Sequence, residues 1–174
     1  MLPSLTLVLG GAASGKSGFA EGLVRRASNR RLYLATAEAH DDEMRSQIAR
    51  HRQARAADGW DTVEAPMDLG PALAAASADQ AVLLDCATLW LSNHMLSDSE
   101  MAAAEVALFA ALATCAAPVV VVSNEVGLSV VPDNALARRF QRAQGTLNQS
   151  LAARAGLVVL VAAGLPMTLK GTLP

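Results

Sequence analysis

The sequence predicts an α/β fold with a mainly parallel sheet covered by helices on both faces. Short, continuously apolar segments alternate along the chain with longer segments of helical periodicity. Strands buried on both faces have this continuous apolar character, whereas half-exposed strands alternate apolar and polar residues. The first apolar segment also runs into a glycine-rich turn and then a helix, a unit typical of parallel α/β proteins.

Composition favours one folded domain, spanning residues 1–174. The chain has 174 residues, of which 52% are apolar and only 17% charged, so a sizeable core is expected. The net charge of −2 lacks the basic footprint of a nucleic-acid-binding protein. No apolar run has the length of a membrane span, and the N-terminus lacks the basic region of a signal peptide. Cys86 and Cys115 are interpreted as reduced, buried thiols, so the expected compartment is the cytoplasm.

The strands are predicted where apolar residues run without interruption. The last strand is expected at 157–161, followed by a short tail from Gly164, and the order of strands in the sheet is not predicted. The expected strands are residues 5–9, 31–36, 61–64, 81–85, 118–122 and 157–161.

The helices are predicted from apolar spacing and end signals. Acidic residues at 41–43 suit the first turn of the second helix, and Pro71 is tolerated in the first turn of a small helix that Asp68 caps. Asp133 or Asn134 caps the last helix. The expected helices are residues 16–27, 40–57, 68–76, 88–96, about 100–115 and about 135–155.

The first strand leads into a segment that fits the spacing G-x-x-x-x-G-K-[ST], the P-loop of nucleotide-binding proteins. Its backbone N–H groups and the helix N-terminus would hold phosphates, Lys16 would reach the β- and γ-phosphates, and the Ser17 hydroxyl would hold Mg²⁺. A glycine turn that binds nothing is disfavoured, because the flanking strand and helix are both present. The segment is Gly10-Gly11-Ala12-Ala13-Ser14-Gly15-Lys16-Ser17.

Two further residues are candidates for chemistry. Asp85 ends a buried strand, where a P-loop protein commonly places a carboxylate that holds Mg²⁺; the alternative is a cap for the next helix. His51 shares a helix face with Met44, Ile48 and Arg55. Local chemistry alone favours a packing role for this histidine, although the arginines of that helix suit an anionic ligand.

Asn124 and Glu125 end another strong strand, and the sequence leaves their role open. They could orient a nucleophile or a second Mg²⁺ ligand, or they could fix the following loop. The segment lacks the Asn-Lys-x-Asp pattern of guanine-reading switch GTPases. His94 is interpreted as structural or exposed, and no role is assigned to His40.

Together these segments resemble the bifunctional adenosylcobinamide kinase / adenosylcobinamide-phosphate guanylyltransferase family of cobalamin biosynthesis. The resemblance covers nearly the whole chain in order. Its most specific part begins Ser123-Asn124-Glu125-Val126-Gly127 and continues to residue 149. The other matching segments are residues 10–17, 33–37, 42–44 with Ile48 and 51–52, 60–64 and 83–86.

The resemblance implies a RecA-like P-loop fold and two reactions. ATP or GTP would phosphorylate the aminopropanol hydroxyl of adenosylcobinamide, and GTP would then transfer GMP to that phosphate, giving adenosylcobinamide-GDP and pyrophosphate. It implies that His51 carries GMP covalently, that Lys16 is catalytic, that Ser17 and Asp85 hold Mg²⁺, and that the protein is a homotrimer. The implied nucleotide contacts beyond the P-loop are Ala35, Thr36, Ala37, Arg52, Gln53, Ala54, Arg55, Glu64 and Asp85.

Two departures from the family pattern leave these roles in place. Ala13 stands where many members carry arginine, and Arg50 stands where a second histidine often precedes the nucleophile. One alternative function is a simple P-loop small-molecule kinase in which His51 is structural. The other is a regulatory module that binds GTP without chemistry on a small molecule.

Overall fold

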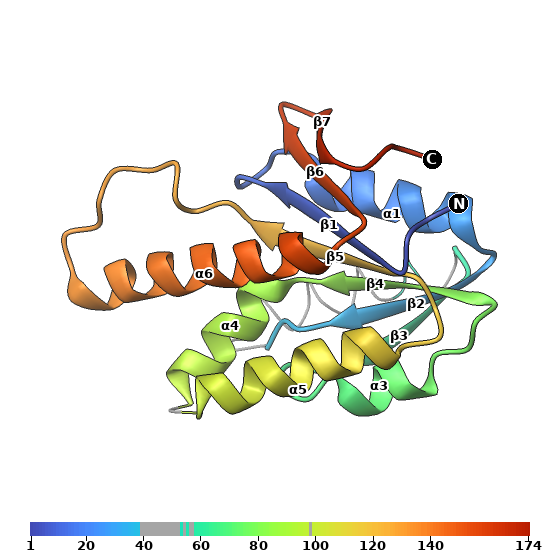
Figure 1. Cartoon of the computed structure of the whole chain (residues 1–174), viewed down its shortest axis with the longest axis horizontal. Helices are drawn as coiled ribbons and strands as arrows, with labels where there is room; N and C mark the ends of the chain where they lie inside the picture. Colours follow the sequence, from blue (N-terminus) through green and yellow to red (C-terminus); the bar gives the residue numbers. More distant parts are fainter. Residues whose placement is uncertain (39–52, 54, 56–57, 98) are drawn as a thin grey trace.

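A computed structural model gives the structure of the protein and describes residues 1–38, 53, 55, 58–97 and 99–174 (Figure 1). Seven strands form one sheet in the order β3-β2-β4-β5-β1-β6-β7. Neighbouring strands are parallel except β6 and β7, which are antiparallel. The strands are β1 (Leu5–Gly10), β2 (Arg30–Ala35), β3 (Trp60–Glu64), β4 (Gln80–Asp85), β5 (Val119–Asn124), β6 (Leu157–Ala162) and β7 (Leu165–Lys170).

Helices cover both faces of the sheet, as the sequence predicts (Figure 1). Helix α1 (Lys16–Ala27) packs on one face. The other face carries α3 (Gly70–Ala75), α4 (Ala87–Leu96), α5 (Met101–Thr114) and α6 (Ala135–Arg154). The helix expected at 40–57 lies outside the described residues, except Gln53 and Arg55, which are helical.

Two hydrophobic clusters separated by the sheet form the core. Side chains of a strand point alternately to its two faces, so Val8 of β1 packs with α1 whereas Leu7 and Leu9 pack with the helices opposite. All six residues of β1 are buried, which explains its continuous apolar sequence. The interior is mainly Leu, Val and Ala, with Trp90 buried among them.

The prediction for the C-terminus is wrong, because the chain after β6 turns back as β7. Ala163 and Gly164 form the turn, with φ of 51° and 78°. Positive φ at both central residues is the geometry that suits a tight hairpin. Every residue of β7 is exposed, and Pro166 is tolerated because β7 is an edge strand. The segment has no continuous apolar run, but its alternation of Leu165, Met167 and Leu169 with Pro166, Thr168 and Lys170 was an available strand signal.

Other expectations are refined. Asn134, not Asp133, caps α6, since its Oδ1 accepts a hydrogen bond of 2.8 Å from the Ala137 N–H. Asp68 Oδ1 accepts a 3.0 Å hydrogen bond from the N–H of Gly70, where α3 begins. Both cysteines are free, but only Cys86 is buried, so the expectation of a buried Cys115 thiol is wrong. Among the described residues, no helix is long and apolar enough to cross a membrane.

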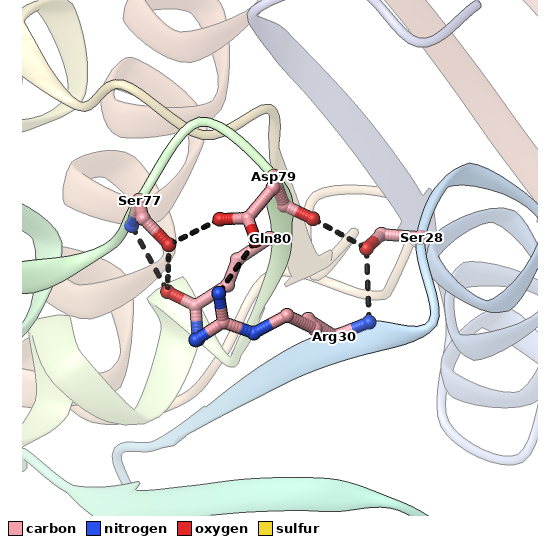
Figure 2. A network of polar contacts seen from close by, with 5 residues as sticks. All are labelled: Ser28, Arg30, Ser77, Asp79 and Gln80. Atoms are coloured by element: carbon pink, nitrogen blue, oxygen red, sulfur yellow. Dashed lines mark hydrogen bonds and ion pairs between the residues drawn. The ribbon is translucent and has the colours of Figure 1, made fainter.

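A polar network joins the turns before β2 and β4 at the edge of the sheet where these strands begin (Figure 2). Ser28 Oγ donates to the Asp79 carbonyl at 2.7 Å and accepts from the Arg30 N–H at 2.9 Å. The Arg30 guanidinium donates to Asp79 Oδ2 at 2.5 Å. The hydrogen bonds from Ser77 and Arg30 lower the pKa of the Asp79 carboxyl. This network anchors the start of the two strands whose opposite ends carry Ala35 and Asp85.

Candidate active site

The P-loop leaves β1 and wraps into the first turn of α1. Gly15 at the helix N-cap has φ of 89°, and Ala13 has φ of 54°, so the loop contains two left-handed residues. A Cβ at Gly10 would collide with Ser14 Oγ and would lie 2.7 Å from the Val161 carbonyl oxygen. Glycine at position 10 is therefore required by the close approach of β6 and the loop. The hairpin turn before β7 supports the loop, since the Gly164 N–H donates to the Ser14 carbonyl at 2.8 Å.

Lys16 begins α1, and its side chain folds back over the loop. Its Nζ donates to the Gly11 carbonyl oxygen at 3.1 Å, so the ammonium group lies where the P-loop curves. There are no acidic residues in the first turn of α1. The positive helix terminus and the ammonium charge therefore act together on an anion held by the loop. Ser17, the predicted Mg²⁺ ligand of the P-loop, is half-buried in the same first turn.

Asp85 ends β4, and Tyr33 of β2 holds its carboxylate. The Tyr33 hydroxyl donates to Asp85 Oδ2 at 2.8 Å. Burial, and secondarily the nearby Asp85 charge, raises the pKa of Tyr33 far above its ordinary value. The hydroxyl therefore stays protonated and remains a donor throughout the neutral range. Oδ1 of Asp85 has no hydrogen-bond partner within the part of the chain that the structure describes.

Arg55 contacts the tyrosine of this pair. Its guanidinium carbon lies 3.4 Å from the centroid of the Tyr33 ring, and Trp60 packs edge-on to the same ring at 6.0 Å. An arginine stacked on an aromatic face is held by cation–π attraction. The role of the Tyr33 hydroxyl was missed from the sequence. The available signal was the single polar group within the otherwise apolar run of β2.

Lys16 follows β1 and Asp85 ends β4, so both lie at the same end of the sheet, because these two strands flank β5 and run parallel to it. The Cys86 thiol is buried, and burial is the main cause that raises its pKa. The Asp85 charge raises that pKa further and the Lys16 charge lowers it, so both charges lie within electrostatic range of one thiol. The structure thus brings together the P-loop lysine and the carboxylate that the sequence analysis selected independently.

Three predicted contact residues lie at the end of β2 and in the residues that follow. Ala35 is buried in the strand, and Ala37 is half-buried. The Thr36 side chain is fully buried, and its Oγ1 donates to the Cys86 carbonyl at 2.8 Å and accepts from the Cys86 N–H at 2.7 Å. This side chain therefore fixes the connection after Asp85. The Asn93 amide of α4 donates to the Thr36 carbonyl at 2.9 Å.

The structure describes only some of the remaining predicted contact residues. Glu64 is exposed at the end of β3, in register with Ala35 of β2. Gln53 is helical and exposed. The proposed nucleophile and its neighbours, His51, Arg52 and Ala54, lie outside the described residues.

The open question about Asn124 and Glu125 is answered in part. Glu125 fixes the following loop, because its Oε1 accepts from the Gly127 N–H at 2.7 Å and its own N–H donates to the Gly10 carbonyl at 3.1 Å. The backbone of Asn124 is also engaged, with its N–H donating to Thr88 Oγ1 at 2.8 Å. His94, interpreted as structural or exposed, is buried, with Nε2 at 3.2 Å from the Met67 carbonyl oxygen.

A buried polar network that the sequence analysis did not identify supports the end of β5. Ser123 Oγ donates to Asn148 Oδ1 at 2.6 Å, and the Asn148 amide donates to the Asn124 carbonyl at 3.0 Å. The Gln144 amide donates to Ser123 Oγ at 2.9 Å. Gln144 and Asn148 occupy the buried face of α6 together with Leu147. Polar residues at apolar helical spacing were the signal that could have revealed this network.

Comparison with known proteins connects this geometry to a family. The family described as "Cobinamide kinase / cobinamide phosphate guanyltransferase" matches residues 6–169. The chain belongs to this family. Membership confirms the resemblance stated from the sequence, and cobinamide kinase and cobinamide phosphate guanyltransferase are the two activities of the family.

Two relatives illustrate the extent of the match. The chain is 44% identical over 168 residues to the bifunctional adenosylcobalamin biosynthesis protein CobP of Pseudomonas aeruginosa, covering 95% of this chain and 96% of that protein. It is 41% identical over 182 residues to the bifunctional adenosylcobalamin biosynthesis protein CobU of Salmonella typhimurium. The match covers 95% of this chain and 99% of that protein.

Among solved structures, the RadB recombinase is similar in fold. The TM-score is 0.50 at 17% sequence identity, over 91% of this chain and 74% of that one. At this identity the similarity concerns the fold alone. It confirms the predicted RecA-like P-loop architecture in this cobinamide kinase / guanyltransferase family member.

Proposed function

We propose that the P-loop edge of the sheet binds a nucleoside triphosphate and supports two successive transfers to adenosylcobinamide. In the first, the acceptor hydroxyl oxygen bonds to the γ-phosphorus of ATP or GTP, the bond from that phosphorus to the β,γ-bridging oxygen breaks, and the hydroxyl proton is released to solvent. In the second, an imidazole nitrogen of His51 attacks the α-phosphorus of GTP and pyrophosphate leaves. The phosphate that the first transfer placed on adenosylcobinamide then attacks the same phosphorus and releases His51, giving adenosylcobinamide-GDP.

Each described residue has a task in this scheme. The P-loop N–H groups and the start of α1 hold the phosphate chain, and the Lys16 ammonium offsets charge that develops on the leaving phosphates. A neutral histidine is a competent nucleophile near neutral pH, because its unperturbed pKa is about 6.5. We assign nucleotide contacts to residues 10–17, to residues 35–37, to residues 52–55, to Glu64 and to Asp85.

The residues present fit a bound Mg²⁺. A hydroxyl and a carboxylate are hard oxygen donors of the kind that this ion takes, and it commonly keeps waters and phosphate oxygens as its other ligands. Oδ2 of Asp85 is held by Tyr33, so Oδ1 is the oxygen that we expect to face the ion. Bound there, Mg²⁺ would neutralise phosphate charge as the leaving group departs.

The position of Arg55 is the observation that carries the nucleophile assignment. Arg55 follows His51 by four residues in the sequence and stacks on the Tyr33 ring whose hydroxyl binds Asp85. Arg55 therefore contacts the tyrosine that holds the proposed metal carboxylate. This contact supports a nucleophile that works beside the nucleotide.

Two variants test the division of labour. Lys16→Ala should abolish both transfers, because both depend on phosphates held by the P-loop. His51→Ala should abolish transfer of GMP and keep most of the kinase rate, measured with cobinamide and γ-labelled ATP. Equal loss of both activities in His51→Ala would contradict the assignment, and full retention of both would favour the simple kinase.

Three broader parts of the proposal rest on the sequence: the domain count and the compartment on its composition and signals, and the trimer on the family resemblance. We propose that residues 1–174 act as a single catalytic domain in the cytoplasm and assemble as a homotrimer. Light scattering should then give three times the chain mass of 18.0 kDa. A mass of one or two chains would contradict the trimer.

A further inference from the structure

The loop between β5 and α6 presents an apolar surface beside the P-loop. We propose that residues 126–132, together with the groove between α4 and α6, form the docking surface for the corrin ring of the acceptor. We call it the loop–groove surface. The inference rests on the proposed acceptor and concerns where its large ring lies, apart from the hydroxyl that reacts.

The apolar side chains of this loop are far more exposed than is usual. Leu128 is 86% exposed, Val130 90% and Val131 73%, and residues 126–132 include no charged side chain. Leu136, in the first turn of α6, is 56% exposed, and Leu96 at the end of α4 is 68% exposed. Scattered exposed apolar residues are ordinary, but five on the loop and the ends of α4 and α6 indicate a binding surface.

The backbone of the loop is nevertheless held in place by α6. The Gln141 amide donates to the Val126 carbonyl at 3.0 Å and to Ser129 Oγ at 3.2 Å. The Arg138 guanidinium donates to the carbonyl oxygens of Pro132 and Asp133 at 2.9 and 2.8 Å. The loop therefore presents its apolar side chains from a defined backbone. A preorganised surface loses less conformational entropy when it binds a ligand.

A groove lies between the two helices, and the chain that leaves the loop reaches its rim at Asn134, the N-cap of α6. It has a volume of about 330 Å³ and is lined mainly by apolar groups, including Met95 and Leu96 of α4 and Leu136, Ala137 and Phe140 of α6. Ligand sites commonly enclose about 300–1,000 Å³, so this groove is large enough for one edge of a macrocycle. The exposed loop residues then offer contact to the remainder.

The loop–groove surface lies at the end of the sheet where the transfers occur. Asn124 at the end of β5 is in register with Gly10 at the start of the P-loop, and the Glu125 N–H donates to the Gly10 carbonyl. From there the loop extends beyond the strand ends before α6 returns along the sheet (Figure 1). A ring docked on this surface can extend its hydroxyl-bearing side chain toward the phosphates.

The chemistry of the surface suits a corrin more than a charged ligand. Cobinamide is a large, carbon-rich macrocycle fringed by neutral amide groups. The loop offers apolar contact without charge, and its Ser129 hydroxyl can pair with an amide. A second copy of this chain is the competing occupant, and it would have to leave the adjoining nucleotide edge open to an acceptor of this size.

Polar substitutions on the surface test the inference. Val130→Ser and Leu136→Ser each remove apolar contact at an exposed position, so neither should disturb folding. The matched control is Val106→Ser on α5, a residue that is 70% exposed away from the loop. The assay measures KM for cobinamide at saturating GTP, KM for GTP at saturating cobinamide, and molecular mass by light scattering.

We expect KM for cobinamide to rise about tenfold in both loop–groove variants, with KM for GTP and the mass unchanged. An unchanged KM for cobinamide would overturn the inference. A changed mass would also overturn it and would assign the surface to a second copy of the chain. Equilibrium binding of cobinamide, measured through its visible absorbance, distinguishes a failure of the proposed function from a failure of the docking surface. Binding without transfer in the native protein would contradict the proposed function, whereas binding equal in native and variant proteins would contradict the docking surface.

Discussion

Replacing Tyr33 by Phe tests how the proposed metal carboxylate is held. The substitution removes one hydroxyl and keeps the ring that packs against Arg55 and Trp60. Asp85 Oδ2 then loses its 2.8 Å hydrogen bond and is free to rotate. We expect Mg²⁺ to be bound more weakly and the fold to be retained.

The size of the effect follows from the hydrogen bond. A bond to a charged group contributes about 1.5–3 kcal/mol. Asp85 is only half-buried, so water can replace the hydroxyl, and the lower value of about 1.5 kcal/mol applies. If that bond orients the carboxylate toward the ion, its loss raises the Mg²⁺ concentration for half-maximal kinase rate about tenfold.

The assay is a Mg²⁺ titration of the kinase rate in native and Tyr33→Phe protein. The control is Thr146→Val, which removes the hydrogen bond from an exposed hydroxyl to the Arg142 carbonyl on α6, far from the P-loop in the chain. An unchanged Mg²⁺ dependence in folded Tyr33→Phe protein would refute the reasoning that Tyr33 positions a metal ligand.

The same residue gives a spectroscopic test, because the chain contains a single tyrosine. Burial, and then the Asp85 charge, raises the pKa of Tyr33, so tyrosinate absorbance should be absent in the folded protein at pH values where free tyrosine ionises, near 10. The unfolded tyrosine ionises there and the folded one does not. The contribution to stability is therefore complete below about pH 10 and falls as the pH rises above it. Tyrosinate appearing near pH 10 before unfolding would contradict the buried hydrogen bond.

Three further predictions concern the P-loop and the opposite edge of the sheet. Lys16→Ala should reduce both transfers to background while the unfolding midpoint stays within a few degrees, measured with labelled ATP and GTP and by calorimetry. Gly10→Ala should destabilise the protein by about 1–3 kcal/mol in denaturant titrations, because the added Cβ meets Ser14 and β6, whereas Gly145→Ala, with open space at its Cβ, should not destabilise it. Asp79→Asn should lower the melting temperature at neutral pH. Because the Asp79 pKa is depressed, the difference from the native protein should begin to shrink below about pH 4, the ordinary range of an Asp carboxyl, and vanish once the pH is below the depressed pKa of the folded protein; a difference that persisted in stronger acid would exclude the carboxylate as its source.

Much of the fold could be predicted from periodicity, because most strands are buried on both faces. The six predicted strands agree with β1 to β6 within one or two residues at each end. The seventh was missed because β7 has no continuous apolar run and carries Pro166, although apolar residues alternate along it at 165, 167 and 169. Strand order could not be predicted from the sequence either. Parallel connections of similar length join strands that are adjacent in the sheet and strands that are not.

The candidate site was predictable where function restricts residue type and spacing. The P-loop and Asp85 were selected from sequence and lie on the same edge of the sheet. The Tyr33–Asp85 hydrogen bond was not predictable, because it joins residues 52 positions apart through strand order. The exposed loop after β5 gave no signal either, since apolar residues at 126–132 could equally have been buried.

The most direct test of the account uses GTP labelled at the α- or the γ-phosphate, incubated with the protein and Mg²⁺ and then denatured. The account predicts that α-label stays on the chain, is lost in acid and survives in base, as a phosphoramidate does, and that His51→Ala retains none. Absence of retained α-label from native protein that binds GTP, or equal retention in His51→Ala, would contradict the claim that His51 carries GMP.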